Sequence, residues 1–157
     1  MAVEIERKFL VLDHSFKEGV TGKAMMQGYV CSEDHKTVRA RISDKSAWLT
    51  IKGPTAGFSR SEFEFEIPVD EANALLDSLA PERRVQKTRY CVEHQGHTWE
   101  VDVFAGPNAP LILAEIELNS ESETFEKPVW LGQEVTEDSR YYNSYLAEHP
   151  YSSWKEV

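Results

Sequence analysis

The sequence opens with a strand-like segment of alternating charged residues, Glu4-Ile5-Glu6-Arg7-Lys8. In an extended chain, residues two apart share a face, so Glu4, Glu6 and Lys8 line one side and Arg7 lies on the other. Two carboxylates and an ammonium group would form a poor hydrophobic core. They are instead groups that bind a divalent cation and phosphate.

Six later segments repeat this pattern, each with an apolar face and a charged face. A solvated outer face, which any antiparallel sheet can have, would mix both signs of charge with Ser, Thr, Asn and Gln. Here the charged faces are sorted by sign, and this predicts an interior that gathers cations for an anion and carboxylates for a metal. The basic faces hold Arg39 and Arg41, Lys52, and Lys87 and Arg89; the acidic faces hold Glu62, Glu64 and Glu66, Glu100 and Asp102, and Glu115 and Glu117.

A bound polyanion together with a divalent cation would balance these charges. Six enclosed cations would repel one another strongly at low dielectric, and carboxylates alone offset only part of that repulsion. Arginine binds phosphate through two parallel hydrogen bonds, and lysine supplies a compact point charge. The acidic faces offer only oxygen ligands, and the five histidines show no ligand spacing, which indicates Mg²⁺ or Mn²⁺ rather than zinc.

Composition limits the class of protein. The 157 residues, 41% hydrophobic and 28% charged, predict one globular domain over residues 1–157. The net charge of −10 argues against a nucleic-acid-binding surface, and we expect no membrane segment or signal peptide, hence a cytoplasmic location. Cys31 and Cys91 are expected as free thiols. A monomer and a homodimer both stay open.

The segments that position the charged faces follow one another at the short spacing of an antiparallel α+β domain. Strands are expected over 2–12, 26–32, 36–43, 47–52, 60–68, 85–93, 98–104 and 111–119. Exposed sheet edges need protection, which favours closure into an eight-stranded antiparallel β-barrel.

Two helices are expected to flank these strands. The first would cover 71–79, with Asp70 as its N-cap and Leu75, Leu76 and Leu79 on its buried face. The second would cover 138–147, and His149-Pro150 would end it.

The ordered set of charged motifs closely resembles the CYTH family, also called triphosphate tunnel metalloenzymes. The resemblance rests on E-x-E-x-K at 4–8, R-x-R at 39–41, Lys52, R-S-E-F-E at 60–64, K-x-R at 87–89, Asp102 and E-x-E at 115–117. The segment 136–146 is similar to the end of small bacterial members, where a helix plugs or borders the tunnel. The resemblance implies an eight-stranded tunnel with its charged face inward, which hydrolyses or rearranges triphosphates with a divalent metal.

The resemblance also implies roles for individual residues. Phosphate oxygens would be held by the six cations Lys8, Arg39, Arg41, Lys52, Lys87 and Arg89. Metal would be held by Glu4, Glu6, Glu115 and Glu117, and a second metal, a water molecule or the cations would be positioned by Glu62, Glu64 and Asp102. The catalytic set is therefore Glu4, Glu6, Lys8, Asp102, Glu115 and Glu117.

Hydrolysis of inorganic tripolyphosphate is the first expectation, because the cations already satisfy a bare polyphosphate. Thiamine triphosphatase and nucleoside triphosphatase are alternatives that need a stacking surface, for which Trp48 has the lumen parity. A class IV adenylyl cyclase shares the motifs, and a non-catalytic polyphosphate-binding module would not need the two E-x-E pairs. The roles of Arg60, Glu66 and Arg140 stay open.

Overall fold

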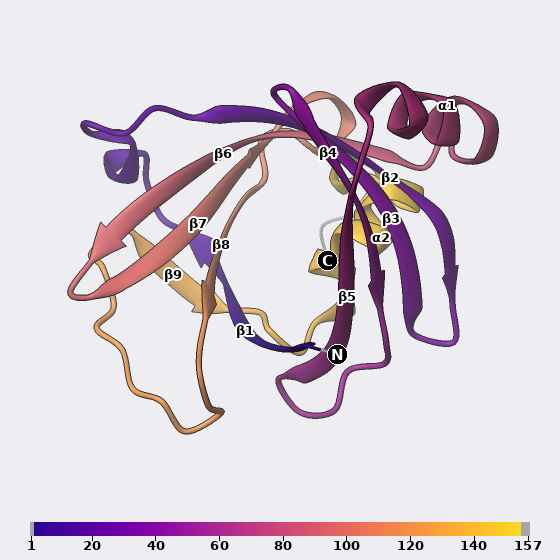
Figure 1. The fold of residues 1–157 in the computed structure, drawn as a ribbon. Helices are drawn as coiled ribbons and strands as arrows, with labels where there is room; N and C mark the ends of the chain where they lie inside the picture. The colour runs from indigo at the N-terminus through magenta and orange to yellow at the C-terminus, as the bar shows by residue number, and fades with distance from the viewer. Residues whose placement is uncertain (1, 155–157) are drawn as a thin grey trace.

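The computed structural model describes residues 2–154, and its strands form a barrel (Figure 1). The strands are β1 Ala2–Val11, β2 Lys23–Glu33, β3 Lys36–Ser43, β4 Ser46–Lys52, β5 Ser59–Ile67, β6 Arg84–His94, β7 His97–Phe104, β8 Ile112–Glu117 and β9 Leu131–Glu134. The helices are α1 Val69–Leu79 and α2 Asn143–Glu148, with short 3-10 turns at Ser15–Lys17, Gly106–Asn108, Ser139–Tyr141 and Tyr151–Ser153. Among these residues, neither α-helix has the length and hydropathy needed to cross a bilayer.

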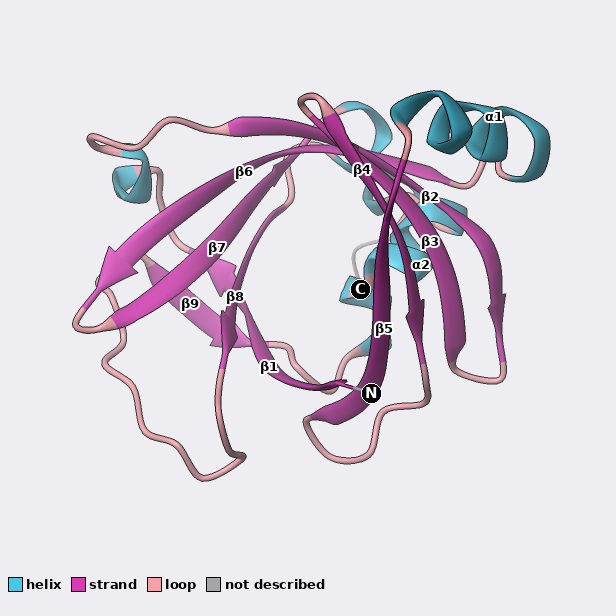
Figure 2. Cartoon of the chain, in the orientation of Figure 1, coloured by secondary structure: helices cyan, strands magenta, loops and turns pink. Residues whose placement is uncertain are grey.

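Eight of the strands close into an antiparallel barrel in the order β5-β4-β3-β2-β6-β7-β8-β1, and β1 returns to pair with β5 (Figure 2). Closure pairs the backbone groups that a free edge would leave exposed. The predicted eight-stranded antiparallel barrel is thereby confirmed. The ninth strand, β9, pairs with β1 near Phe9 and Val11 and was not predicted, because its four residues include Gly132 and show no alternation.

β1 changes partner along one of its edges. Residues 2–5 pair with β5, and Phe9 and Val11 pair with β9, while the other edge pairs with β8 over residues 6–10. At the change of partner, Lys8 N donates to Thr136 Oγ1 at 3.0 Å, and Val135 N donates to Lys8 O at 2.8 Å. The segment after β9 therefore satisfies the backbone of Lys8 where β5 has left it.

The largest apolar core lies outside the barrel. Phe9, Trp99 and Ile116 have the parity opposite to the charged residues of β1, β7 and β8, and all three are buried. They pack against side chains that the connecting segments supply, including Phe16, Phe125 and Trp130. Because the connecting segments cover this face, the charged face of the same strands is left for the interior.

One end of the interior is apolar and is closed by α2. Tyr29, Val85 and Phe104 lie on the lumen-facing side of their strands and pack against Leu146 and Ala147 of α2. Figure 1 shows α2 behind β5, at this end of the barrel. The hydrophobic contact fixes the C-terminal segment against the barrel interior.

α1 packs over β2 and β3, but two details of the predicted helix were wrong. The helix begins at Val69 with Pro68 at the N-cap, and no side chain caps it, so Asp70 lies within the first turn. Its buried positions are Ala72 and Leu76, followed by Ala80 at the C-cap, each four residues apart. The buried face of α1 is therefore narrow, and Leu79 lies beside it with 53% of its surface exposed.

The predicted C-terminal helix over 138–147 is divided in the structure. Asp138 accepts a hydrogen bond from Arg140 N and starts a 3-10 turn over Ser139–Tyr141. Tyr142 is then extended (φ −70°, ψ 138°), and α2 begins only at Asn143. The capping geometry of Asp138 competes with a regular helix here.

Candidate active site

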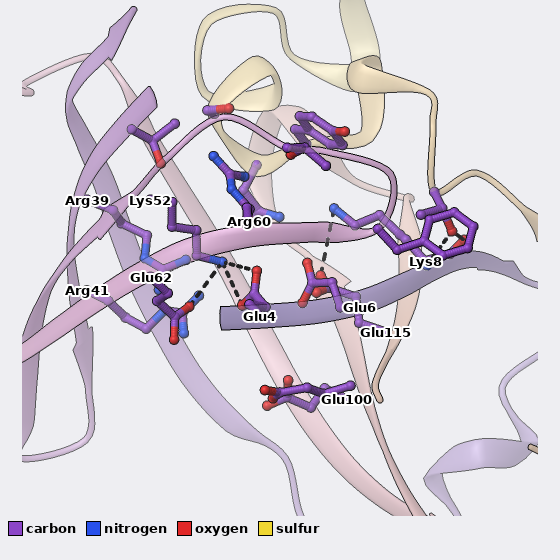
Figure 3. Close-up of a pocket in the computed structure, with 18 of the residues that line it drawn as sticks. Glu4, Glu6, Lys8, Arg39, Arg41, Lys52, Arg60, Glu62, Glu100 and Glu115 are labelled. Carbon is purple, nitrogen blue, oxygen red and sulfur yellow. Dashed lines mark hydrogen bonds and ion pairs between the residues drawn. The ribbon is translucent and has the colours of Figure 1, made fainter. Parts of the chain in front are cut away.

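The charged face of the barrel surrounds a cavity of about 260 Å³. Of the predicted site residues, all except Asp102 line it: Glu4, Glu6, Lys8, Arg39, Arg41, Lys52, Glu62, Glu64, Lys87, Arg89, Glu115 and Glu117. They come from β1, β3, β4, β5, β6 and β8 and point toward one another across the lumen, as Figure 3 shows for the labelled members. The period of two along each strand therefore brings together residues that are far apart in the sequence.

Acidic residues of β1 and β8 face each other on one wall. Glu6 lies opposite Glu117 in the register, and Lys8 lies opposite Glu115, with 3.8 Å between Lys8 Nζ and Glu115 Oε1. Glu4 accepts hydrogen bonds from Lys52 Nζ at 2.9 and 3.0 Å (Figure 3). Lys8 of β1 and Lys52 of β4 thus each contact a carboxylate that was predicted to hold metal.

Crowding of these carboxylates changes their acidity. Burial, followed by the charges of Glu115 and Glu4, raises the pKa of Glu6 well above its ordinary value. Burial also raises the pKa of Glu4. For Glu115 burial acts in the same direction, but Lys8 and a hydrogen bond from Glu6 lower its pKa to about 2. A proton on Glu6 therefore relieves the repulsion that a bound cation would otherwise neutralise.

The donor set of this wall fits a hard divalent cation. Within residues 2–154 no three His, Cys, Asp or Glu side chains converge closely enough to hold an ion by themselves. Mg²⁺ commonly keeps several waters and takes only one or two carboxylates together with substrate phosphates. Oxygen donors on Glu6 and Glu115, close enough to share a hydrogen bond, are consistent with that mode of binding.

Asp102 lies behind the cations rather than on the cavity wall. It is 1% exposed, and its Oδ2 lies 2.7 Å from Lys87 Nζ, while Arg89 binds both of its oxygens at 2.8 and 3.0 Å. Burial raises the pKa of Asp102, but Lys87 and Arg89 outweigh it and hold that pKa well below its usual range. Burial lowers the pKa of Lys87 to about 7. Asp102 consequently orients both cations toward the lumen.

The two arginines of β3 are held more loosely. Arg39 donates to Thr50 Oγ1 at 3.2 Å, and its Nη2 lies 3.9 Å from Glu64. Arg41 Nε donates to Gln27 Oε1 at 2.9 Å. Burial, with repulsion from Arg39 and Arg89, lowers the pKa of Arg41 to about 10. Two weakly neutralised guanidinium groups side by side are suited to binding a polyanion.

The structure also places the residues whose roles were open. Arg60 lines the cavity, but its Nε donates to Gly53 O at 2.9 Å, so it also ties down the loop before β5. Arg140 is exposed and pairs with Asp138 at 2.6 Å, away from the cavity lining. Glu66 is exposed and lies outside the lining.

Several lining residues were missed by the motif analysis. They are neutral: Thr37, Thr55, Phe58, Thr136, Tyr142, Asn143 and Ser144. Neutral side chains carry no charge sign by which a strand face could be sorted. Those from 136 onward come from the segment beside Lys8 and from the start of α2.

A second cavity of about 490 Å³ adjoins the first. Arg41, Glu64, Arg89 and Glu100 line both cavities, so the two are neighbours. The second cavity adds Thr21, Lys23, Met25, Ser43, Trp48 and Cys91. The lumen parity predicted for Trp48 is confirmed, and Cys31 and Cys91 are both free.

Comparison with known proteins agrees with this geometry. The chain is 46% identical over 156 residues to an inorganic triphosphatase of Acetivibrio thermocellus, covering 99% of this chain and all of the relative. It is 41% identical over 149 residues to an inorganic triphosphatase of Nitrosomonas europaea, covering 92% of this chain and 96% of the relative. A crystal structure of an inorganic triphosphatase superposes with a TM-score of 0.68 at 37% identity, covering 94% of this chain and 95% of that one. Residues 2–148 match the CYTH domain model, and the chain belongs to the CYTH family of triphosphate tunnel metalloenzymes.

Proposed function

We propose that this protein hydrolyses the terminal phosphate of inorganic tripolyphosphate inside its barrel. The observation that carries the proposal is the convergence of seven cations, the six predicted ones and Arg60, and of two facing pairs of carboxylates on one cavity. The relatives that the chain matches over nearly its whole length are inorganic triphosphatases. A bare polyphosphate uses every cation of this lumen without requiring a site for an organic group.

The cations bind and orient the substrate. Arg41, which forms no ion pair within residues 2–154, and Arg39, whose nearest carboxylate is Glu64 at 3.9 Å, supply the main anchors for phosphate oxygens. Lys8 of β1 and Lys52 of β4 reach the same cavity, where an incoming phosphate competes with Glu115 and Glu4 for their ammonium groups. Phosphoryl transfer depends mostly on positioning and on electrostatic stabilisation of the phosphate oxygens, which this arrangement provides.

The acidic wall is proposed to hold Mg²⁺ or Mn²⁺ through Glu4 and Glu6 of β1 and Glu115 and Glu117 of β8. Such an ion neutralises phosphate charge and lowers the pKa of a bound water. Glu62 and Glu64 line the same cavity and can orient water or support a further ion. Asp102 is proposed as a positioning residue for Lys87 and Arg89, because both of its oxygens already contact these cations.

A phosphate-release assay tests the activity. Tripolyphosphate, pyrophosphate, ATP and thiamine triphosphate are each incubated with the protein in Mg²⁺, in Mn²⁺ or in EDTA. We expect the fastest release from tripolyphosphate with metal and none in EDTA. Tight binding without release would indicate a binding module, and conversion of ATP to cyclic AMP would indicate a cyclase.

Organic triphosphates are the second candidate substrates, and the second cavity favours them. Trp48 and Met25 line that cavity beside Arg41. An aromatic ring there can stack on a nucleobase or thiazole whose phosphates occupy the charged lumen. If this holds, replacing Trp48 with alanine raises the KM for ATP but leaves the KM for tripolyphosphate unchanged.

A further inference from the structure

Two neutral amides link the cations of β3 and β6, the two strands that flank β2 in the barrel. Gln27 of β2 is fully buried, and its Oε1 accepts from Arg41 Nε at 2.9 Å. Its Nε2 donates to the Tyr29 hydroxyl at 2.9 Å and to Asn143 Oδ1 at 3.3 Å. Asn143 Oδ1 also accepts from Lys87 Nζ at 3.0 Å. A continuous chain of hydrogen bonds therefore runs from Arg41 to Lys87 through the first residue of α2.

The surrounding groups determine which way the Gln27 amide points. A primary amide has two N–H donors on nitrogen and lone pairs only on oxygen. Both donors of Gln27 have acceptors, in Tyr29 and Asn143, and the oxygen faces a guanidinium that can only donate. The opposite orientation would place an N–H group against Arg41 Nε–H and lose the contact.

The Arg41 side chain has fewer other polar contacts than Arg39 and Arg89, so it depends more strongly on the Gln27 amide. Within residues 2–154, Arg39 and Arg89 lie within 4 Å of a carboxylate, whereas no ion pair is formed by Arg41. Within the described residues, Gln27 provides the one hydrogen bond that the Arg41 guanidinium makes. A neutral amide holds the side chain without cancelling its charge, so the Nη nitrogens and the full positive charge stay free for an anion.

We propose that Gln27 is a positioning residue for substrate binding, which holds Arg41 in place for the phosphate and, through Asn143, couples Arg41 to Lys87 and to α2. The inference rests on the proposed triphosphatase function. It assigns the C-terminal segment a role in setting the spacing between two phosphate-binding cations, beyond closing the end of the barrel.

The primary test is Gln27→Met, which keeps the side-chain length and removes both the acceptor and the donors. We expect the KM for tripolyphosphate to rise about tenfold, equivalent to ~1.4 kcal/mol of lost binding, with kcat changed less than about threefold. The same substitution is then made in an Arg41→Ala background. Because Gln27 acts through Arg41, it should there add no further increase in KM. Equal increases in both backgrounds would overturn the proposal, since an independent structural role gives additive effects.

Two further variants test the chemistry of the contact. Gln27→Glu keeps an acceptor for Arg41 Nε but introduces a neutralising charge, so the KM should rise although the contact is retained. A wild-type KM in Gln27→Glu would contradict the need for a neutral partner. Asn143→Leu breaks the link to Lys87 and α2, and a KM rise of about threefold or more is expected. An unchanged KM in Asn143→Leu would show that Asn143 does not couple Arg41 to Lys87 and α2.

A matched control is available at Asn108, another buried amide, which lies outside the cavity and accepts from Tyr151 N at 2.9 Å. Asn108→Leu should lower the melting temperature without changing the KM, and melting curves of all variants identify any that misfold. Calorimetric titration of inorganic tripolyphosphate in EDTA separates the two hypotheses. If the wild type binds in this titration but releases no phosphate in the assays with Mg²⁺ or Mn²⁺, the triphosphatase proposal fails, while weaker binding by Gln27→Met would still support the positioning role. Unaltered affinity in Gln27→Met would refute that role.

Discussion

At the scale of single residues, Arg7 and Lys8 are neighbours in β1 that lie on opposite faces of the strand, and their roles differ accordingly. Lys8 faces the cavity, whereas Arg7 faces outward, with Nη2 2.6 Å from Glu134 Oε1. The Arg7 guanidinium also lies over the rings of Phe58 and Phe125, at 5.3 and 5.1 Å from their centroids. The contacts of Arg7 are therefore structural, and those of Lys8 belong to the site.

We expect Arg7→Ala to lower the free energy of unfolding by about 1–2 kcal/mol, from the lost ion pair and cation–π contacts, and to leave kcat and KM within about twofold of wild type. Lys8→Ala should lose most of the tripolyphosphatase activity. Urea unfolding and phosphate release measure the two effects. Inactive but fully stable Arg7→Ala protein would show that Arg7 takes part in the reaction.

Glu117 is suited to testing the metal site, because it is exposed and lies in the cavity lining. In Glu117→Gln we expect kcat at limiting Mg²⁺ to fall about 100-fold, since losing even a side chain that only supports a metal ligand costs about 10–100-fold in metal affinity or activity. Excess Mg²⁺ should restore part of the lost kcat. Glu66→Gln is the matched control, since this carboxylate shares the lumen parity but lies outside both linings. Equal Mg²⁺ dependence in both variants would exclude Glu117 as a ligand.

Charge explains which site residues could be predicted from the sequence. Glu4 and Glu115 alternate with apolar neighbours, so the period of two placed each on the charged face of its strand before any fold was known. Gln27 and Asn143 have no charge to sort, and Asn143 reaches the lumen only through the long connection after β8. The positioning contacts depend on tertiary structure that no local pattern reports.

At the scale of elements, most strands were predictable and the part of the chain after β8 was less so. β3 and β7 have strong alternation and turns at both ends, and their predicted bounds differ from the structure by at most one residue. The C-terminal helix was predicted too long, because the local capping contact between Asp138 and Arg140 N interrupts it. β9 has too few residues for a period, and it forms through long-range pairing with β1.

Packing of α1 on the sheet depends on Gly28 of β2. A Cβ at this position would clash with Leu76 Cδ2 and would lie 3.4 Å from Ala80 Cβ. Since Leu76 is only 1% exposed and cannot move aside freely, Gly28→Val should cost about 2 kcal/mol and lower the melting temperature by roughly 4–8 °C. Ala24→Val, on the same face of β2 but exposed, is the control and should change little. Equal melting temperatures for the two variants would contradict this close contact.

At the scale of the whole molecule, a chain with a net charge of −10 encloses a cavity whose lining holds seven cations, the six predicted ones and Arg60. The main apolar core lies outside the barrel, and the interior is stabilised by ion pairs and, at one end, by α2. The sorted charges predicted an inward charged face, but closure into a tunnel was inferred from the family resemblance. The alternation of charged and apolar residues along the strands could not by itself distinguish a closed barrel from an open sheet covered on one face.

The crowded carboxylates of the lumen make the stability of the metal-free barrel depend on pH, and bound metal should remove this dependence. Without metal, burial first and then neighbouring carboxylates raise the pKa of Glu4, Glu6 and Glu117 above the ordinary value of 4.5. The folded state then holds protons more tightly than the unfolded chain, so stability present below pH 4.5 is lost as pH rises through the folded pKa values. Glu115, with its pKa lowered to about 2, acts oppositely, and its contribution is lost only as pH falls from 4.5 toward 2.

Between pH 4.5 and 7 the raised carboxylates therefore dominate, and in EDTA we expect the melting temperature to be higher at pH 5 than at pH 7 by at least about 3 °C. One pKa unit corresponds to ~1.4 kcal/mol, and ~1 kcal/mol shifts the melting temperature by roughly 2–4 °C at this size. Mg²⁺ at pH 7 should remove the difference by neutralising the same carboxylates. Glu6→Gln should reduce the difference in EDTA, because it replaces the carboxylate whose pKa is raised well above its ordinary value with a neutral group. A melting temperature in EDTA that rises from pH 5 to pH 7 would show that this cluster does not control the stability of the metal-free barrel.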